Sequence, residues 1–141
     1  MAYSRRSKQG QRFVVKREYI SYRLERAEES LQEAKLLAEH KHFNTAVNRI
    51  YYACFYMVDA LLTQNDIKHT SHTGTKSQLH KYFGKSERIS RELLVFYGQL
   101  FQARQTSDYG DQVIMTKEDF EEFYPQALSF RTAILEMIED E

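Results

Sequence analysis

Proline occurs once in the 141 residues, at position 125, and glycine occurs only five times. Because these two residue types are the strongest interrupters of helices, the sequence permits long uninterrupted helical segments. Apolar residues recur at steps of three and four through most of the chain, which is the spacing of one face of an α-helix, and no alternating strand pattern is present. The sequence therefore predicts an all-α protein, an up-and-down bundle of four to five helices.

The apolar spacing also predicts where the helices lie. Their expected ranges are Tyr19 to the EHKHF stretch, Phe43 to Leu62, a shorter helix ending around Gly84, one starting between Ser86 and Ile89, and one starting after Thr116. Pro125 falls about two turns into the last of these, where it is expected to kink or split the helix.

The second expected helix is apolar around nearly its whole circumference, which places it at the centre of the bundle. Its few polar members, Asn48, Arg49 and Asp59, therefore need an explanation. Asn48 and Arg49 either contact a ligand in a cleft or form hydrogen bonds across the bundle, and the two interpretations are equally open.

Charge is unevenly distributed along the chain. Twenty basic and twenty acidic residues give a formal net charge of zero, so the whole-molecule field does not indicate a nucleic-acid binder. Residues 1–17, however, contain six basic residues and no acidic one. We expect this segment to be a flexible basic arm, either simply solvated or in contact with RNA phosphates or an acidic partner, ahead of a helical domain over residues 18–141.

Several classes of site and location are disfavoured by residue content. The single cysteine, Cys54, excludes an internal disulfide framework. His69 and His72 lack carboxylates or cysteines at a recognised metal-ligand spacing, so no metal site is expected, and the absence of a glycine-rich phosphate loop leaves no cofactor to expect. With no apolar run long enough for a membrane span or a signal peptide, we expect a cytoplasmic protein.

The stretch FQARQTSDYGD at residues 101–111 closes the fourth expected helix. Arg104 is in phase with the apolar stripe of that helix, and a guanidinium group is not buried without a partner. Arg104 therefore pairs with a carboxylate, for which Asp108 one turn later is suitable, or it faces a cleft open to an anionic ligand. In the first case the stretch is an ordinary helix end, with Tyr109 packed beside the pair.

Three segments together resemble the HEPN superfamily, a group named for nucleotide binding in higher eukaryotes and prokaryotes. They are YRLERAEESLQEAKLLAEHKHFNTAVNRIYYACFYMVDALL at residues 22–62, SHTGTKSQLHKYFGK at residues 71–85 and ARQTSDYGD at residues 103–111. The most specific part is AVNRIYYACFY at residues 46–56, followed by Arg104 and Asp108-Tyr109. The resemblance covers about residues 19–138 and points to the small stand-alone prokaryotic branch. It implies a four- to five-helix bundle that dimerises and is often encoded beside a minimal nucleotidyltransferase in toxin–antitoxin pairs; many members are metal-independent RNases.

The RNase members of this superfamily use an arginine, four to six residues, and then a histidine. The arginine falls on Arg104 and the histidine position on Tyr109, and no histidine follows residue 80. A tyrosine, with a reference pKa of about 10, does not exchange its proton near neutral pH, so the obvious base is missing and Asp108 is the remaining candidate.

The resemblance also implies two further candidate residues. In some toxin–antitoxin pairs of the superfamily the partner enzyme transfers AMP to a tyrosine, which makes Tyr109 a candidate for modification. Relatives carry Ser/Thr-His before a glycine where His72 lies, so His72 is a candidate for the same cleft.

The preferred interpretation is a binding or regulatory module, homodimeric through its central helices, that engages a nucleotide, RNA or a nucleotidyltransferase partner. One alternative is a metal-independent endoribonuclease with an atypical motif, and another is a structural homodimer without a ligand. The candidate ligand-binding residues are Arg104, Asn48, Arg49 and His72, and the candidate catalytic residues are Arg104, Asp108 and Tyr109.

Overall fold

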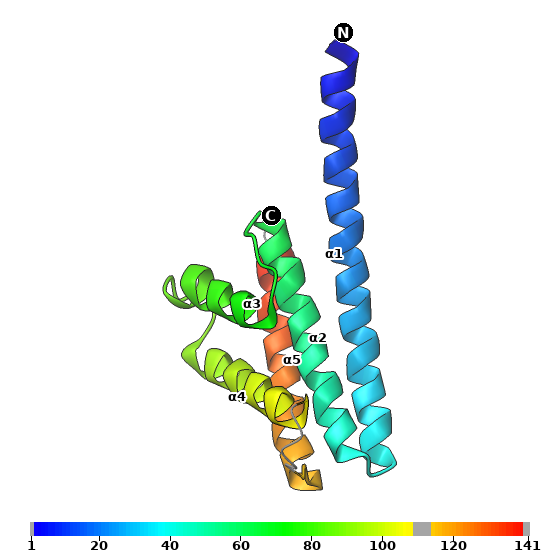
Figure 1. Cartoon of the computed structure of the whole chain (residues 1–141), viewed down its shortest axis with the longest axis vertical. Coiled ribbons are helices and arrows are strands. Elements are labelled where there is room, and N and C mark those ends of the chain that lie inside the picture. Colours follow the sequence, from blue (N-terminus) through cyan, green and yellow to red (C-terminus); the bar gives the residue numbers. More distant parts are fainter. Residues whose placement is uncertain (1, 109–113, 140–141) are drawn as a thin grey trace.

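Figure 1 shows the protein, a computed structural model of the whole chain, in which the regular elements are all helical. The backbone is described for residues 2–108 and 114–139, and the side chains for residues 10–104 and 114–139. No strand occurs in these ranges, so the predicted all-α fold class is confirmed. In chain order the elements are α1 (Ala2–Glu39), α2 (Phe43–Gln64), α3 (His72–Leu79), the π-helical turn η1 (His80–Gly84), α4 (Arg91–Asp108) and α5 (Lys117–Glu139).

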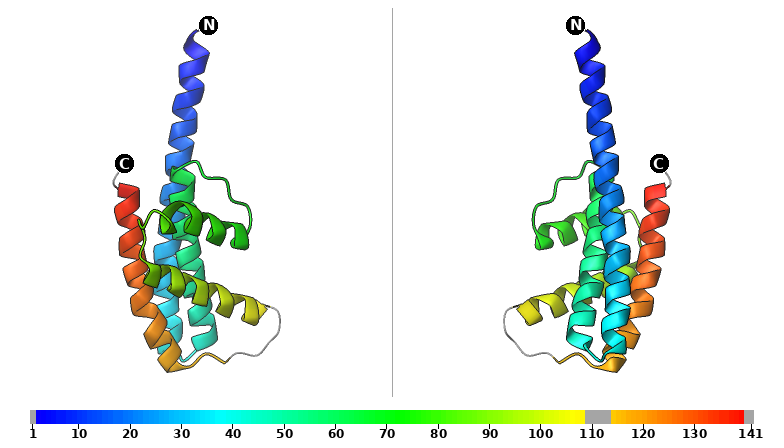
Figure 2. Two further views of the ribbon diagram at one scale, coloured as in Figure 1. Left: turned by 90° about the vertical axis from the view of Figure 1, so that its left-hand side faces the viewer. Right: turned by 90° about the vertical axis from the view of Figure 1, so that its right-hand side faces the viewer.

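Helices α1 and α2 form an antiparallel pair along the long axis of the molecule (Figure 1). The turn between them is tight because Lys41 adopts a left-handed backbone conformation, with φ of 64°. Helix α5 lies along α2, whereas α3 and α4 run across one side of it (Figure 1, Figure 2). Since α2 contacts α1, α3, α4 and α5, it is the central helix, as its apolar circumference predicted.

A single apolar core joins the helices. Its largest fully buried side chains include Tyr51 of α2, Phe83 of η1, Phe96 and Tyr97 of α4 and Phe130 of α5. Removing a side chain of this size from water contributes about 1.5–3 kcal/mol to stability. These aromatic residues therefore serve core packing, the role that their helical spacing predicted.

Helix α1 begins at Ala2, so the predicted start near Tyr19 is wrong. Residues 2–19 contain no proline, and their one glycine, Gly10, costs only about 1 kcal/mol inside a helix. The lysine, arginine and glutamine residues around Gly10 have high helix propensity, so the helix continues through it. The N-terminal part of α1 projects beyond the ends of the other helices (Figure 2). The flexibility expected of residues 1–17 stays a prediction.

The fourth helix also differs from its predicted start, because it begins at Arg91 rather than between residues 86 and 89. Glu87 has a left-handed φ of 57°, which ends the preceding turn and prevents the helix from starting there. Ser90 Oγ then accepts a hydrogen bond from the backbone N–H of Leu93 at 3.2 Å, so Ser90 caps the helix.

Helix α5 follows Thr116, as predicted. Thr116 Oγ1 accepts from the Asp119 N–H at 3.2 Å, and Asp119 Oδ2 accepts from the Thr116 N–H at 2.8 Å, which is a reciprocal capping box. Of the two outcomes expected at Pro125, the split does not occur, since α5 continues to Glu139 with Pro125 inside it; the kink stays a prediction. Burial of the apolar face of α5 in the core offsets the backbone hydrogen bond that proline removes.

Candidate functional site

Arg104 lies near the C-terminal end of α4 and points toward α2. Its guanidinium carbon is 5.7 Å from the ring centroid of Tyr51, a cation–π contact with a side chain that is only 1 % exposed. One and two turns earlier on α4, Leu100 and Tyr97 are fully buried. The predicted helical phase of Arg104 is therefore confirmed: the guanidinium group sits at the edge of the core.

A small crevice between α2 and α4 brings Arg104 next to Asn48. Its remaining lining residues are Asn44, Val47, Tyr51, Ala103 and Met115. The space inside is about 10 Å³, roughly enough for one water molecule. The segment before α5 closes one side, because the N–H of Met115 donates to Asn44 Oδ1 at 2.6 Å. A phosphate is too large for the interior, so an anion reaches Arg104 and Asn48 only from the mouth of the crevice.

His72, from a different element, meets the same tyrosine. Its Nδ1 is 2.7 Å from the Tyr51 hydroxyl, and its ring stacks on Phe55 with centroids 4.3 Å apart. The position of His72 is fixed by the start of α3, because Ser71 Oγ accepts from the N–H of Gly74 at 2.8 Å and caps the helix. Tyr51 thus lies between the guanidinium of Arg104 and the imidazole of His72.

Burial raises the pKa of Tyr51 to about 12, against the opposing effect of the positive charge of Arg104. The phenol is therefore protonated at neutral pH and can donate its hydrogen to His72 Nδ1. A further cation lies close by, since Lys76 Nζ of α3 is 5.7 Å from the ring centroid of Phe101, which packs edge-on against Tyr51. Arg104 and Lys76 give this region a positive character that suits an anionic ligand.

Arg49 does not share the crevice. Its guanidinium lies over the ring of Tyr52 at 5.1 Å and 3.8 Å from Glu33 Oε2 of α1. Asn48 thus lines the crevice beside Arg104, whereas Arg49 bridges to α1; contact of either residue with a ligand stays a prediction. The two residues are linked by a 3.3 Å hydrogen bond from Arg49 to Asn48 Oδ1.

Two candidates cannot be placed with the others. The side chain of Asp108 and the whole of Tyr109 lie outside the described residues. The pairing of Arg104 with Asp108 and the roles assigned to Tyr109 as a substitute for histidine or as a modification target therefore stay predictions.

Sequence reasoning did not identify Tyr51 as the residue that links Arg104 and His72, because its helical spacing indicated only a core position. It also missed the partner of His69, whose Nε2 lies 2.5 Å from Asp59 Oδ1 while its Nδ1 lies 2.8 Å from the carbonyl of Ile67. The sequence signal that could have found this pair was Asp59, a carboxylate on an otherwise apolar helix.

Within the described ranges no group of three or more His, Cys, Asp and Glu residues could hold a metal ion, and no helix is long and apolar enough to cross a membrane.

The fold and the crevice together define a class: a helical bundle with an arginine at the edge of its core, next to an amide and over a tyrosine that contacts an imidazole. Comparison with known proteins gives the family. The HEPN domain model matches residues 20–138, and the chain therefore belongs to the HEPN domain family. The expectation drawn from the three sequence segments is confirmed.

Relatives of this chain occur in bacteria and archaea. A "UPF0332 protein" of Thermotoga maritima is 38 % identical over 125 residues, which is 89 % of this chain and 95 % of the relative. A Methanocaldococcus jannaschii protein named "Putative toxin MJ0142" is 35 % identical over 98 residues, covering 70 % of this chain and 67 % of that protein. A second protein from that organism, "Putative toxin MJ0605", is 36 % identical over 96 residues.

Proposed function

We propose that this HEPN protein binds a phosphate group of a nucleotide or of RNA at the mouth of the Arg104 crevice. The observation that supports this most strongly is the placement of Arg104 over Tyr51, beside Asn48 on the neighbouring helix. A guanidinium held in one orientation offers several N–H donors to a phosphate, and the amide of Asn48 can add another. Tyr51 limits the guanidinium to that orientation.

We further propose that the protein is one half of a toxin–antitoxin pair whose other member is a nucleotidyltransferase. Support comes from the names of two relatives as toxins and from the family to which the chain belongs. A homodimer through the central helices is part of the same proposal. The partly exposed aromatic residues of α2, Tyr52, Phe55 and Tyr56, provide an apolar surface suited to it.

Binding at the crevice is tested with a fluorescein-labelled oligoribonucleotide and with AMP, comparing wild type, Arg104→Ala and Arg131→Ala. Arg131 is a matched control because it is also a partly exposed arginine, it pairs with Glu28 of α1 at 3.0 Å, and it does not line the crevice. Loss of a charge-assisted hydrogen bond predicts that Arg104→Ala weakens binding about tenfold or more, whereas Arg131→Ala changes it little. Equal affinities for all three proteins would exclude the crevice as the binding site.

A second candidate function is RNA cleavage without a metal ion. It is favoured by the imidazole of His72, a proton-exchanging group that lies 2.7 Å from the hydroxyl of Tyr51, the tyrosine whose ring Arg104 covers. Incubation of RNA with the protein in a chelator separates the two functions. If the protein is a binding module, wild type leaves the RNA intact, and cleavage by Tyr109→His would then show that the site lacks only the family's histidine. If wild type cleaves the RNA and Arg104→Ala does not, the protein is an enzyme.

The third possibility, a structural homodimer without a ligand, makes a different prediction for the same variants. In that case Arg104→Ala changes only the free energy of unfolding, measured in urea, and neither nucleotide nor RNA binds to wild type. Sedimentation velocity on wild type and on Phe55→Glu, which places a charge in the partly exposed aromatic surface of α2, tests the dimer itself. A monomeric wild type would refute it.

A further inference from the structure

The N-terminal part of α1 is the largest feature that the proposed function does not use. It is helical from Ala2 and projects beyond the ends of the other helices (Figure 1, Figure 2). It precedes the segment that the HEPN model matches, which starts at residue 20. A helix that extends into solvent gains little from burial, so its sequence is free to serve a contact with another molecule.

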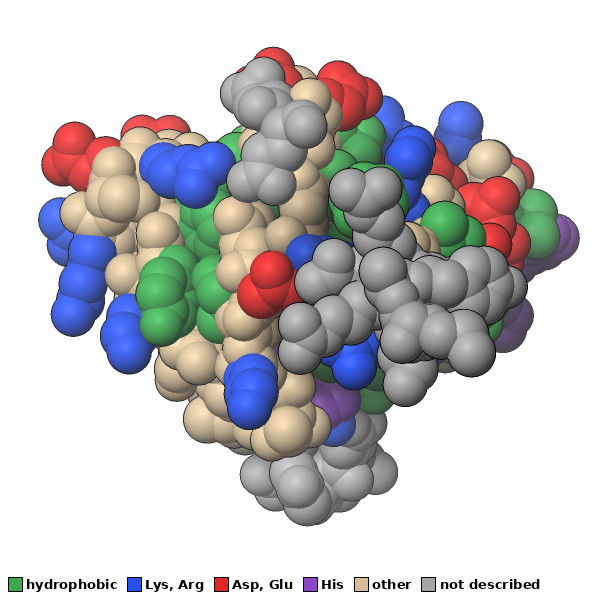
Figure 3. Space-filling view, turned by 90° about the horizontal axis from the view of Figure 1, so that it is seen from above, with side chains coloured by type: hydrophobic (Ala, Val, Ile, Leu, Met, Phe, Trp, Pro, Cys, Tyr) green, Lys and Arg blue, Asp and Glu red, His purple; other side chains and the backbone are tan. Residues whose placement is uncertain are grey.

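Charge is divided sharply between this projection and the rest of the chain. Residues 1–17 hold six of the twenty basic residues and none of the acidic ones, which leaves fourteen basic and twenty acidic residues in the remainder, a formal charge of −6. Seen from above, along the long axis, basic and acidic side chains of the described residues are intermixed around the bundle (Figure 3). By residue count, the excess of positive charge therefore belongs to residues 1–17.

The helical repeat gathers most of these cations on one side. At 100° per residue, positions 5, 8, 12 and 16 fall within about 80° of one another around α1. Arg5, Lys8, Arg12 and Lys16 occupy them. We call these four positions the basic stripe of α1; they span about 16 Å along the helix axis.

The basic stripe continues the face of α1 that meets α2. Inside the bundle this face has carboxylate partners on and just after α2: Arg23 Nε lies 2.7 Å from Asp59 Oδ2, and Lys16 Nζ lies 2.9 Å from Asp66 Oδ1. Helix α2 ends at Gln64, and the projection extends past it (Figure 2). The upper positions of the stripe therefore lie where α2 no longer offers carboxylates.

A groove opens at the foot of the stripe. Its lining includes Arg12, Lys16 and Tyr19 from α1 and Thr63 and Asp66 from the end of α2, around an open volume of about 560 Å³. The exposed carboxylate of Asp66, 85 % accessible, pairs with Lys16 here and can be displaced by a stronger polyanion.

The exposed apolar residues of the projection argue against a partner helix. Phe13, Val14 and Val15 are 59, 51 and 63 % exposed. Three consecutive residues spread over about 200° of the helix circumference, so they do not form the single apolar stripe that helix pairing requires.

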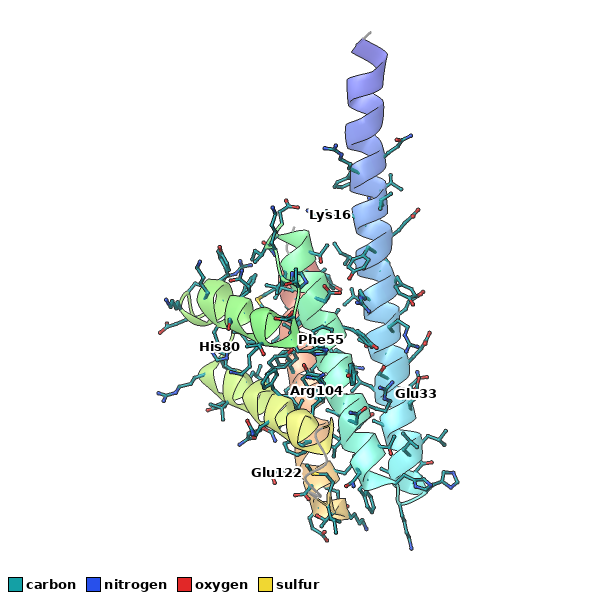
Figure 4. All side chains as sticks on the ribbon, in the orientation of Figure 1. Lys16, Glu33, Phe55, His80, Arg104 and Glu122 are labelled. Atoms are coloured by element: carbon teal, nitrogen blue, oxygen red, sulfur yellow. The ribbon has the colours of Figure 1, made fainter. Side chains whose placement is uncertain are left out.

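We propose that the projecting part of α1 binds the phosphate backbone of a nucleic-acid strand through its basic stripe, at a surface separate from the Arg104 crevice. Lys16 and Arg104 lie well apart on the molecule (Figure 4). A linear row of cations on one side of a helix matches a linear row of phosphates, and release of counterions supplies the driving force. The contact requires no base recognition.

The test compares wild type with a variant carrying Arg5→Gln, Lys8→Gln and Arg12→Gln, because glutamine keeps the helix propensity and removes the charge. The matched control carries Lys35→Gln, Lys41→Gln and Lys117→Gln, which removes the same charge at the opposite end of α1. Affinity for labelled single-stranded RNA and for DNA of the same sequence is measured by fluorescence anisotropy across a range of salt concentrations. Circular dichroism checks that the variants stay helical.

The basic-stripe variant is expected to bind at least tenfold more weakly at low salt, with a slope of log K against log salt that is about 2 units less steep, since three phosphate contacts are lost. The control variant is expected to keep the wild-type slope. RNA and DNA are expected to respond alike, because the phosphodiester backbone is common to both.

Three outcomes would overturn the proposal: an unchanged slope in the basic-stripe variant, an equal loss in the control variant, or a wild type that binds neither strand. Sedimentation velocity without nucleic acid adds a fourth, because loss of self-association with unchanged RNA binding would assign the stripe to a second copy of the chain. Arg104→Ala is measured in parallel. If it leaves RNA binding unchanged while the basic-stripe variant weakens it, the crevice proposal fails and the basic-stripe proposal stands.

Discussion

At the scale of single residues, Asp59 shows how one buried carboxylate organises three segments. Its Oδ2 accepts from Tyr19 at 2.5 Å and from Arg23 at 2.7 Å, both on α1, and its Oδ1 lies 2.5 Å from His69 in the loop before α3. Burial and the bond to Asp59 raise the pKa of the Tyr19 hydroxyl. The loop between α2 and α3 is thus attached, through His69, to both α1 and α2.

Asp59→Asn is expected to lower the free energy of unfolding by about 2 kcal/mol, because it removes the charge that balances Arg23 in a mostly buried network. Asp66→Asn is the matched control: its ion pair with Lys16 is exposed, and asparagine tolerates the left-handed φ of 56° at that position. The control should lose less than about 0.5 kcal/mol. Urea unfolding of the two variants measures both values, and similar losses would contradict a dominant role for burial.

The candidate site shows which roles of single residues can be recognised from the sequence. Arg104 was identifiable from the sequence because an arginine in phase with an apolar stripe violates the local pattern. Tyr51 was not, because a tyrosine in the apolar face of a helix obeys that pattern. Its role follows only from the contacts on its two sides, with Arg104 of α4 and His72 of α3.

At the scale of elements, helix ends were predictable where the terminating or capping residues act locally. Gly84 ends η1 and Thr116 precedes α5, as the sequence indicated. The start of α1 was missed because nothing local distinguishes a charged helix in solvent from a charged coil. The sequence left open whether Pro125 kinks or splits the last helix, and α5 stays continuous because packing on the core offsets the local cost of proline.

The capping box of α5 gives a quantitative expectation. Thr116→Ala removes the hydroxyl that accepts from the Asp119 N–H, and should lower the free energy of unfolding by about 1 kcal/mol. Thr132→Ala, in the exposed interior of the same helix, should have almost no effect or be slightly stabilising, since alanine has the higher helix propensity. Thermal or urea unfolding of both variants distinguishes capping from a general loss of threonine.

At the scale of the whole molecule, the chain is a helical domain with an added projection. No residue of α1 between positions 10 and 26 is fully buried, and the first that is buried is Ala27. The core therefore uses only the later part of α1, and the projection adds charge and length without adding to the core.

Deleting residues 2–9 is expected to change the free energy of unfolding by less than about 0.5 kcal/mol, as for other surface changes. Leu31→Ala, in the buried part of the same helix at 2 % exposure, should cost about 2–5 kcal/mol. Urea unfolding at several protein concentrations measures both. A large, concentration-dependent loss on deletion would show that the projection is buried against a second copy.

The sequence by itself determined the helical class, the central position of α2 and the candidate status of Arg104 and Asn48. Each of these follows from periodicity or from a polar residue out of place, and both signals are local. Only the tertiary structure decided which side chains meet. Arg49 turns toward Glu33 of α1 while Asn48 joins Arg104, although the two are neighbours in the chain. The pairs of Tyr51 with His72 and of Tyr19 with Asp59 bring together residues far apart in sequence, and only the packing of complete helices sets such distances.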